Sequence, residues 1–351
     1  MQRATGAADP REALMVLPSA KFNLFLSLMD NRDVLLNVVS FLDRRTLASC
    51  LTVSQQFYEV VGPLLYRDLR VSFWRGPNPL DGISCLSADT TDQSRRRKLE
   101  LLRYTTSLNL GNHHLHCRPF TDVSLSLPNL RVLRISSDPY PLSLCAPRGP
   151  RCPLFVQLQP IKLVLSPYHP LYPTLPNGAG EVLPPSVETV VIIEKPHTGI
   201  TPWPDLGYTF LSPTHRSHLK TLEIVFVTQG PDMGFTYTSP CPVLGLDFTV
   251  SHPRDTFWKN LSRVGAVFEG EIRIVNAEGF EREWLGFGEG DVEGKVEHRV
   301  RGMLERVMED RGVGGEEVEE RLKRIRVVAM REWLKGDWEG VVEPSEVKGW
   351  L

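Results

Sequence analysis

The stretch from Asp33 to Phe57 carries more apolar side chains than so small a unit can bury within itself. At about 100° per residue, five apolar residues near its start share a helical arc of roughly 120°. A unit of about 40 residues is near the lower limit for independent folding. Because a buried Val, Leu or Phe contributes about 1.5–3 kcal/mol, exposing several would be costly. We therefore expect this surface to dock on the rest of the chain or on another protein. The five residues are Val34, Leu35, Val38, Phe41 and Leu42.

Two more short helices are predicted within the same stretch. Asp43 directly follows the first helix and can cap a second, which carries Leu47, Cys50 and Leu51 on its apolar positions. Ser54 can cap a third helix with Phe57, Val60 and Val61 on one face. Gly62-Pro63 predicts the end of that helix, and residues 64–71 then an extended exit. An alternative interpretation is the first part of an ordinary helical core.

This stretch resembles an F-box. The spacing from Asp33 to Leu42 matches the family pattern without a gap, whereas Asp30 and Asn31 replace the Leu-Pro with which the pattern usually opens. In the family that Leu-Pro contacts a Skp-type adaptor. The resemblance implies a three-helix F-box over residues 28–70, after a partly disordered segment 1–27. The matching residues are Asp33, Val34, Leu35, Val38, Leu42, Asp43, Leu47, Val53 and Phe57.

The composition favours a soluble globular protein. Of 351 residues, 41% are hydrophobic and 23% are charged, and no apolar run reaches the length that a membrane span needs. Residues 22–29 are apolar but too short, and we expect a helix there that docks on the F-box unit. A net charge of -2 gives no reason to expect nucleic acid. The six cysteines form no CxxC pair, which fits a reducing compartment, the cytoplasm or the nucleus.

Short apolar strands recur through the middle of the chain, with starts 23, 31, 26 and 32 residues apart. The segments 128–135 and 218–224 resemble the core of leucine-rich repeats, whose usual period is about 20–29 residues. The alternative is an unrelated α/β domain, and both interpretations predict a parallel sheet. The expected fold class is therefore α/β, with an irregular leucine-rich-repeat-like solenoid over residues 71–351. The predicted strands are Ser107–Leu110, Leu130–Ile135, Ile161–Leu165, Val187–Ile193 and Leu219–Val227.

The other connectors and the C-terminal region have their own patterns. Twelve prolines in residues 139–185 exclude long helices there. The basic run 95–98 is expected in a solvated loop before a short helix at 98–104. Helices are predicted from about residue 255 and around residues 296–307, strands at 271–275 and 325–329, and a helical turn at 330–334. Surface loops are expected at 286–294 and 310–318.

No motif predicts catalysis or a cofactor. His113, His114, His116 and Cys117 could supply two zinc ligands, but no second pair lies nearby, so a surface loop is the preferred interpretation. The chain has no P-loop, GxSxG or HExxH motif, and we expect no catalytic residues, metal or cofactor. Trp203, which lies between two prolines, is a weak candidate for contact with a target protein.

The F-box resemblance implies a substrate-recognition subunit of a cullin–RING ubiquitin ligase. The F-box would bind a Skp-type adaptor, and the C-terminal domain would present an unknown target. The alternatives are a leucine-rich-repeat-like scaffold, whose helices only cap the solenoid, and an unrecognised enzyme. Residues expected to form the F-box core or its adaptor interface are Val34, Leu35, Val38, Leu42, Leu47, Leu51, Val53 and Phe57.

Overall fold

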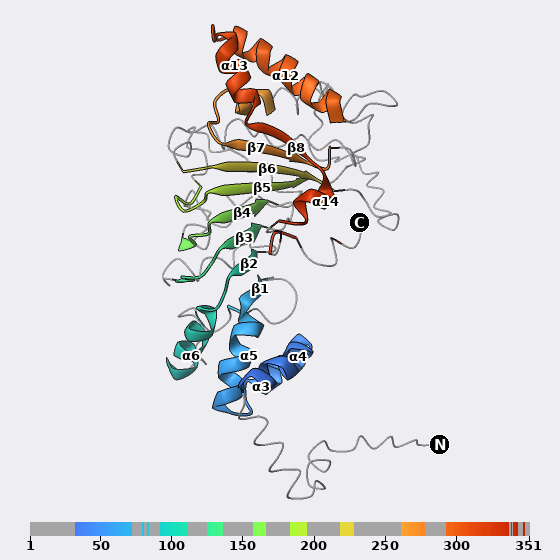
Figure 1. Ribbon diagram of the computed structural model, residues 1–351. Coiled ribbons are helices and arrows are strands. Elements are labelled where there is room, and N and C mark those ends of the chain that lie inside the picture. Colours follow the sequence, from blue (N-terminus) through green and yellow to red (C-terminus); the bar gives the residue numbers. More distant parts are fainter. Residues whose placement is uncertain are drawn as a thin grey trace, which may run out of the picture. The chain divides into compact units, whose positions relative to one another are not determined.

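The chain divides into two compact units, Met1–Arg67 and Asp68–Leu351, each described by itself below (Figure 1). The division lies close to the predicted end of the helical module at residue 70. The computed structural model describes residues 32–71, 79–80, 83, 92–110, 125–135, 157–165, 183–194, 218–227, 261–277, 293–336, 338, 340–342 and 347.

Three helices make up the described part of the first unit: α3 (Arg32–Ser40), α4 (Arg44–Cys50) and α5 (Gln55–Arg67). Both α3 and α4 pack against α5. Three helices were predicted for this stretch, and three are present.

The third helix does not end at Gly62-Pro63, so that prediction was wrong. Pro63 lies inside α5, which continues to Arg67. An interior proline costs about 3 kcal/mol or more. Burial of Val60 and Val61 before it, and packing of Leu64 and Leu65 after it, outweigh this cost. Of the predicted extended exit 64–71, only Asp68–Val71 is extended, and it forms the first strand of the second unit.

The second unit is built on an eight-stranded sheet whose strands are all parallel and follow one another in chain order. This confirms an α/β fold with a parallel sheet. Parallel neighbours cannot be joined by a tight hairpin, so a longer crossover connection must link each pair. The strands are β1 (Asp68–Val71), β2 (Ser107–Leu110), β3 (Val132–Ile135), β4 (Lys162–Leu165), β5 (Thr189–Glu194), β6 (Thr221–Phe226), β7 (Glu271–Val275) and β8 (Ile325–Val328).

The strand register aligns two rows of aliphatic side chains across the sheet. Because side chains alternate between faces, both rows lie on the same face. Nearly all of their members are fully buried, so this face forms the core of the unit. One row is Leu69, Leu108, Leu133, Leu163, Val190, Leu222, Ile272 and Ile325, and the other is Val71, Leu110, Ile135, Leu165, Ile192, Ile224, Ile274 and Val327.

The turns that enter the strands repeat the same hydrogen bonds. The pattern recurs at the entries to β3, β4, β5 and β6. At each entry, two successive N–H groups donate to the carbonyl that lies just before the preceding strand. Two side chains add ties between neighbouring turns: Asn129 Nδ2 donates to Arg103 O at 2.6 Å, and Ser186 Oγ donates to Pro160 O at 2.8 Å. The accepting carbonyls belong to Thr106, Arg131, Ile161 and Glu188.

Part of the opposite face of the sheet is covered by the C-terminal part of the chain. Val164, Val191 and Val225 on this face are fully buried, and they belong to one cluster with Met330 and Trp333. The last two residues lie on α14 (Met330–Trp333), which follows β8 directly (Figure 1). The predicted helical turn at 330–334 is therefore present, and it has a partner that the sequence did not indicate.

Two helical predictions need correction. The basic run 95–98 lies within α6 (Asp92–Leu102) rather than in a loop. The predicted loop 310–318 contains the start of α13 (Gly315–Leu322), which packs with α12 (Glu293–Glu309). Glu316 and Glu317 favour a helix start there because they place negative charge at the positive end of the helix dipole. Val318 is buried against Leu304 and Met308, which fixes the hairpin.

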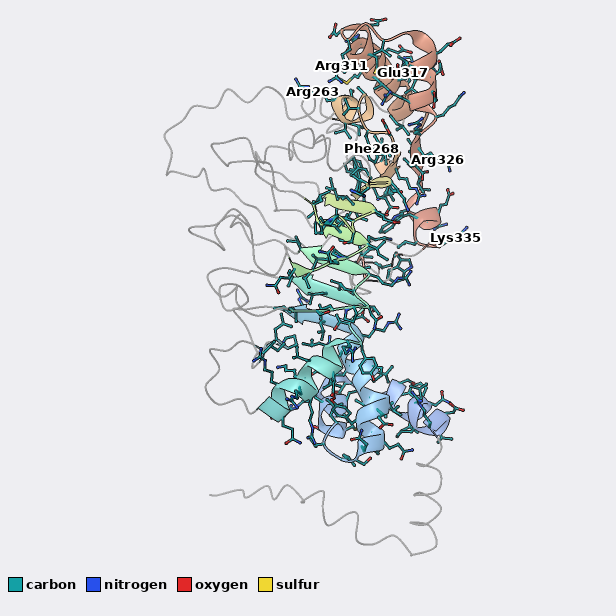
Figure 2. The ribbon with its side chains drawn as sticks, turned by 90° about the vertical axis from the view of Figure 1, so that its left-hand side faces the viewer. Arg263, Phe268, Arg311, Glu317, Arg326 and Lys335 are labelled. Atoms are coloured by element: carbon teal, nitrogen blue, oxygen red, sulfur yellow. The ribbon has the colours of Figure 1, made fainter. Side chains whose placement is uncertain are left out.

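Gly270 is predicted to be required at the entry to β7. A Cβ added there would overlap the carbonyl oxygen of Lys220 and the ring of Phe268, which Figure 2 labels. We expect Gly270→Ala to lower the free energy of unfolding by about 1–3 kcal/mol, the usual range for overpacking. Thermal unfolding followed by circular dichroism measures the change.

Gly302 provides the matched control. It lies inside α12, and an added Cβ would meet nothing within 4 Å. Gly302→Ala should therefore leave stability unchanged or raise it by up to about 1 kcal/mol. Equal melting temperatures for the two variants would contradict the close approach at Gly270.

Candidate protein-interaction surface

The helical unit buries only some of the apolar side chains that it contains. Its buried residues are Leu35 and Val39 of α3, Leu47 of α4, and Val60 and Val61 of α5. Leu35 and Val39 are four residues apart, so α3 turns this edge inward against α5. Six more side chains pack partly buried around this core: Leu42, Cys50, Leu51, Phe57, Leu64 and Leu65.

A second apolar stripe on α3 and the turn after it faces away from this core. Val38 is 44% exposed and Phe41 is 88% exposed. With the partly buried Val34, they fall within a helical arc of about 60°, whose centre is about 110° away from that of the core face. We call Val34, Val38 and Phe41 the exposed stripe. The periodicity placed Val38 and Phe41 in one apolar arc with Leu35, but the buried face is centred between Leu35 and Val39, so Val38 and Phe41 remain exposed.

The exposed apolar side chains are concentrated in this unit. Among the described residues, six large hydrophobic side chains are exposed, and four of them lie in the first unit. Val53, 65% exposed, lies in the turn between α4 and α5, and Leu36, 43% exposed, lies on the polar side of α3. Apolar surface gathered in this way is typical of protein-interaction sites. The other two residues are Tyr104 and Ile161.

Hydrogen bonds at the ends of the helices hold Phe41 in place. The N–H of Phe41 donates to Val38 O at 3.4 Å in the turn that ends α3. Asp43 then caps α4, since its Oδ1 accepts the N–H groups of Arg45 at 2.9 Å and Thr46 at 3.0 Å. Its Oδ2 also accepts the Thr46 hydroxyl at 2.9 Å. The predicted cap at Asp43 is confirmed, and it places Phe41 on a short, ordered connection.

The predicted cap of the third helix is also present. Ser54 Oγ accepts the N–H of Phe57 at 3.3 Å, and Ser54 O accepts the N–H of Tyr58 at 3.0 Å. Val53 precedes this cap, so its backbone is fixed between the last turn of α4 and the start of α5. The N–H of Val53 itself donates to Cys50 O at 3.1 Å.

The predicted site residues separate into three groups. Leu35 and Leu47 are buried in the core of the helical unit, and Val38 and Val53 are exposed. Phe41 was not among the predicted site residues, although it is the most exposed of the large apolar residues described. The periodicity that found it could not show which side of a broad apolar arc turns inward. The partly buried members are Val34, Leu42, Leu51 and Phe57.

Several sequence predictions fall outside the described residues. These are Trp203, the histidine and cysteine cluster 113–117, and the apolar segment 22–29. Within the described residues, no group of three or more His, Cys, Asp or Glu side chains could hold a metal ion. In the same part of the chain, no helix combines the length and apolar character needed to cross a membrane.

Comparisons of the chain with protein-family models, curated proteins and solved structures found no match.

The Asp43 cap predicts a lowered pKa. The backbone N–H and the hydroxyl of Thr46 stabilise the carboxylate and lower the pKa of Asp43 from 3.8. Because the pKa is lower in the folded state, the cap stabilises the fold above the unfolded pKa and is lost as pH falls through the folded pKa. A carboxyl titration by NMR should give a midpoint below 3.8.

Thr46→Val is the control for this titration, since it removes the hydroxyl donor and keeps the backbone N–H. It should raise the midpoint of Asp43 part of the way toward 3.8. An unchanged midpoint in the variant would contradict a contribution from the side chain of Thr46.

Proposed function

We propose that this protein is the substrate-recognition subunit of a cullin–RING ubiquitin ligase of the SCF type. In this proposal the helical unit binds a Skp-type adaptor through the exposed stripe and Val53. The second unit binds a target protein, and the transfer of ubiquitin takes place on other subunits. The observation that carries the proposal is the exposure of Val38 and Phe41 within a stretch that has F-box spacing. The proposed location is the cytoplasm or the nucleus.

The chemistry of the stripe suits a protein partner. Burying one Val or Phe contributes about 1.5–3 kcal/mol, and aromatic side chains frequently dominate interface energies. Phe41 is nearly fully exposed, so almost all of its apolar surface is available for burial against a partner. Because Asp30 and Asn31 replace the usual Leu-Pro, the stripe must supply a larger share of the affinity than in a typical F-box.

Two equally exposed residues of α3 allow a matched test. Val38 is 44% exposed and belongs to the stripe, whereas Leu36 is 43% exposed and lies on the polar side of the helix. Val38→Asp should weaken binding to a purified Skp-type adaptor by about tenfold or more, which corresponds to about 1.4 kcal/mol. Leu36→Asp should bind like the wild type. Calorimetry or surface plasmon resonance measures the dissociation constants.

Circular dichroism of both variants separates binding from folding, since both substitutions add the same charge at the same exposure. Phe41→Asp, at an 88% exposed position, is the second variant and should be at least as damaging to binding as Val38→Asp. Failure of the intact protein to bind the adaptor would refute the proposed function. Equal losses for Val38→Asp and Leu36→Asp would refute the assignment of the interface to the stripe.

A protein-interaction scaffold without a ligase is the second candidate. It is favoured by the in-order parallel sheet, an arrangement that stacked repeats use to present a binding surface. In that case the protein would bind a target but not a Skp-type adaptor, so the same binding measurement separates the two functions.

A further inference from the structure

The C-terminal chain covers part of one face of the sheet. We call residues 330–336, 338, 340–342 and 347 the strap. Met330, Trp333, Val341 and Val342 are all buried, as is Val347. They form one cluster with side chains contributed by β3, β4, β5, β6 and β7. These sheet residues are Val132, Val164, Val191, Ile193, Val225, Val227 and Val275.

A buried hydrogen bond anchors the start of the strap. The indole Nε1 of Trp333 donates to Glu223 Oε2 at 3.1 Å, and Glu223 is only 4% exposed. The other oxygen of that carboxylate accepts from Arg273 at 3.1 Å. Arg273 also donates to Glu271 at 2.8 Å, and this bond lowers the pKa of the Glu271 carboxyl. The sheet therefore presents a carboxylate, oriented by an arginine, to an aromatic N–H donor.

The far end of the strap touches strands distant from β8. Gly340 has a φ of +77°, and a Cβ added there would lie 2.9 Å from Ser107 Oγ and 3.6 Å from Val132 Cβ. Ser107 begins β2 and Val132 begins β3. The strap thus reaches from Glu223 on β6 back to the second and third strands. A glycine is required at this closest approach because of both its φ and the lack of space.

The sheet does not depend on the strap for its own hydrogen bonds. Its eight strands pair with one another in an unbroken series. The helical part of the strap, α14, is a single turn of four residues whose N-cap, Ala329, makes no side-chain cap hydrogen bond. So short a helix has little stability of its own. Removing the strap would leave the sheet paired, with a face that combines valines and a polar anchor.

We propose that this face of the sheet is a peptide-binding site and that the strap is its intramolecular ligand. The occupant is a short apolar segment of a target protein with the chemistry of the strap. It carries an aromatic N–H donor for Glu223, apolar side chains that pack on Val164, Val191 and Val225, and a glycine where the backbone passes Ser107. It binds when the strap leaves. This inference does not require that the helical unit binds an adaptor, and its test contains no adaptor.

The test uses the full chain with Gly340→Val, which forces the strap away from Ser107 without altering a sheet residue. The probe is a fluorescent synthetic peptide of residues 329–351, followed by anisotropy. We expect it to bind the variant about tenfold or more tightly than the wild type, in which the strap competes for the face. A second peptide with Trp333→Phe keeps an aromatic ring but lacks the N–H donor, and it should bind the variant more weakly.

Two outcomes of the peptide measurement would overturn the proposal. One is a folded Gly340→Val variant that does not bind the peptide, and the other is equal binding of the two peptides. Circular dichroism establishes whether the variant is folded.

Native-state hydrogen exchange on the wild-type chain tests the proposal independently, and it can be used if the variant does not fold. The N–H of Trp333 donates to the carbonyl of Ala329, just before the strap, and the N–H groups of Leu334 and Val341 donate to carbonyls within the strap. The proposal requires that they exchange through an opening that leaves the amides of β4 to β6 protected. Exchange of strap and sheet amides in a single event would show that the strap is a fixed part of the core and would overturn the proposal.

Discussion

The parallel register of the eight strands is the constraint on which the second unit depends. In every strand two aliphatic residues that point to one face are aligned by the register, and together they form two aliphatic rows. A slip of one residue would move both rows to the other face, so the pattern fixes the pairing. The connecting segments differ in length, with strand starts between 25 and 54 residues apart. They are free to differ because the rows and the repeated entry turns set the alignment.

The first unit must also bury its apolar side chains, but its interior is too small to hold all of them. Three short helices can enclose Leu35, Val39, Leu47, Val60 and Val61, but the remaining apolar side chains have no interior to enter. This explains why α5 continues through Pro63, since its last turn adds apolar contacts to a small core. It also explains why Val38 and Phe41 remain at the surface. The apolar surplus that the sequence shows is therefore present, and it lies along one edge of the arc that the periodicity predicted.

Local signals predicted much of the fold. The bounds of β2 and β7 agree with the predicted strands, and the caps at Asp43 and Ser54 were expected from residue type and position. Such features depend on neighbours in the sequence. The sequence could not show which side of the apolar arc of α3 is buried, because the choice between Val38 and Val39 depends on packing against α5. The cover over the sheet was not predicted, because the bond between Trp333 and Glu223 joins residues 110 positions apart.

The two apolar surfaces are covered in different ways, and this has a consequence for binding. Trp333 is 8% exposed, whereas Phe41 is 88% exposed. The strap follows β8 after one residue, so it is held near the sheet at an effective concentration on the order of mM. A competitor with the same intrinsic affinity would need a similar free concentration to occupy half of the sites. A physiological competitor must therefore fit the face better than the strap does, and a strap that begins with one uncapped helical turn leaves room for such a difference.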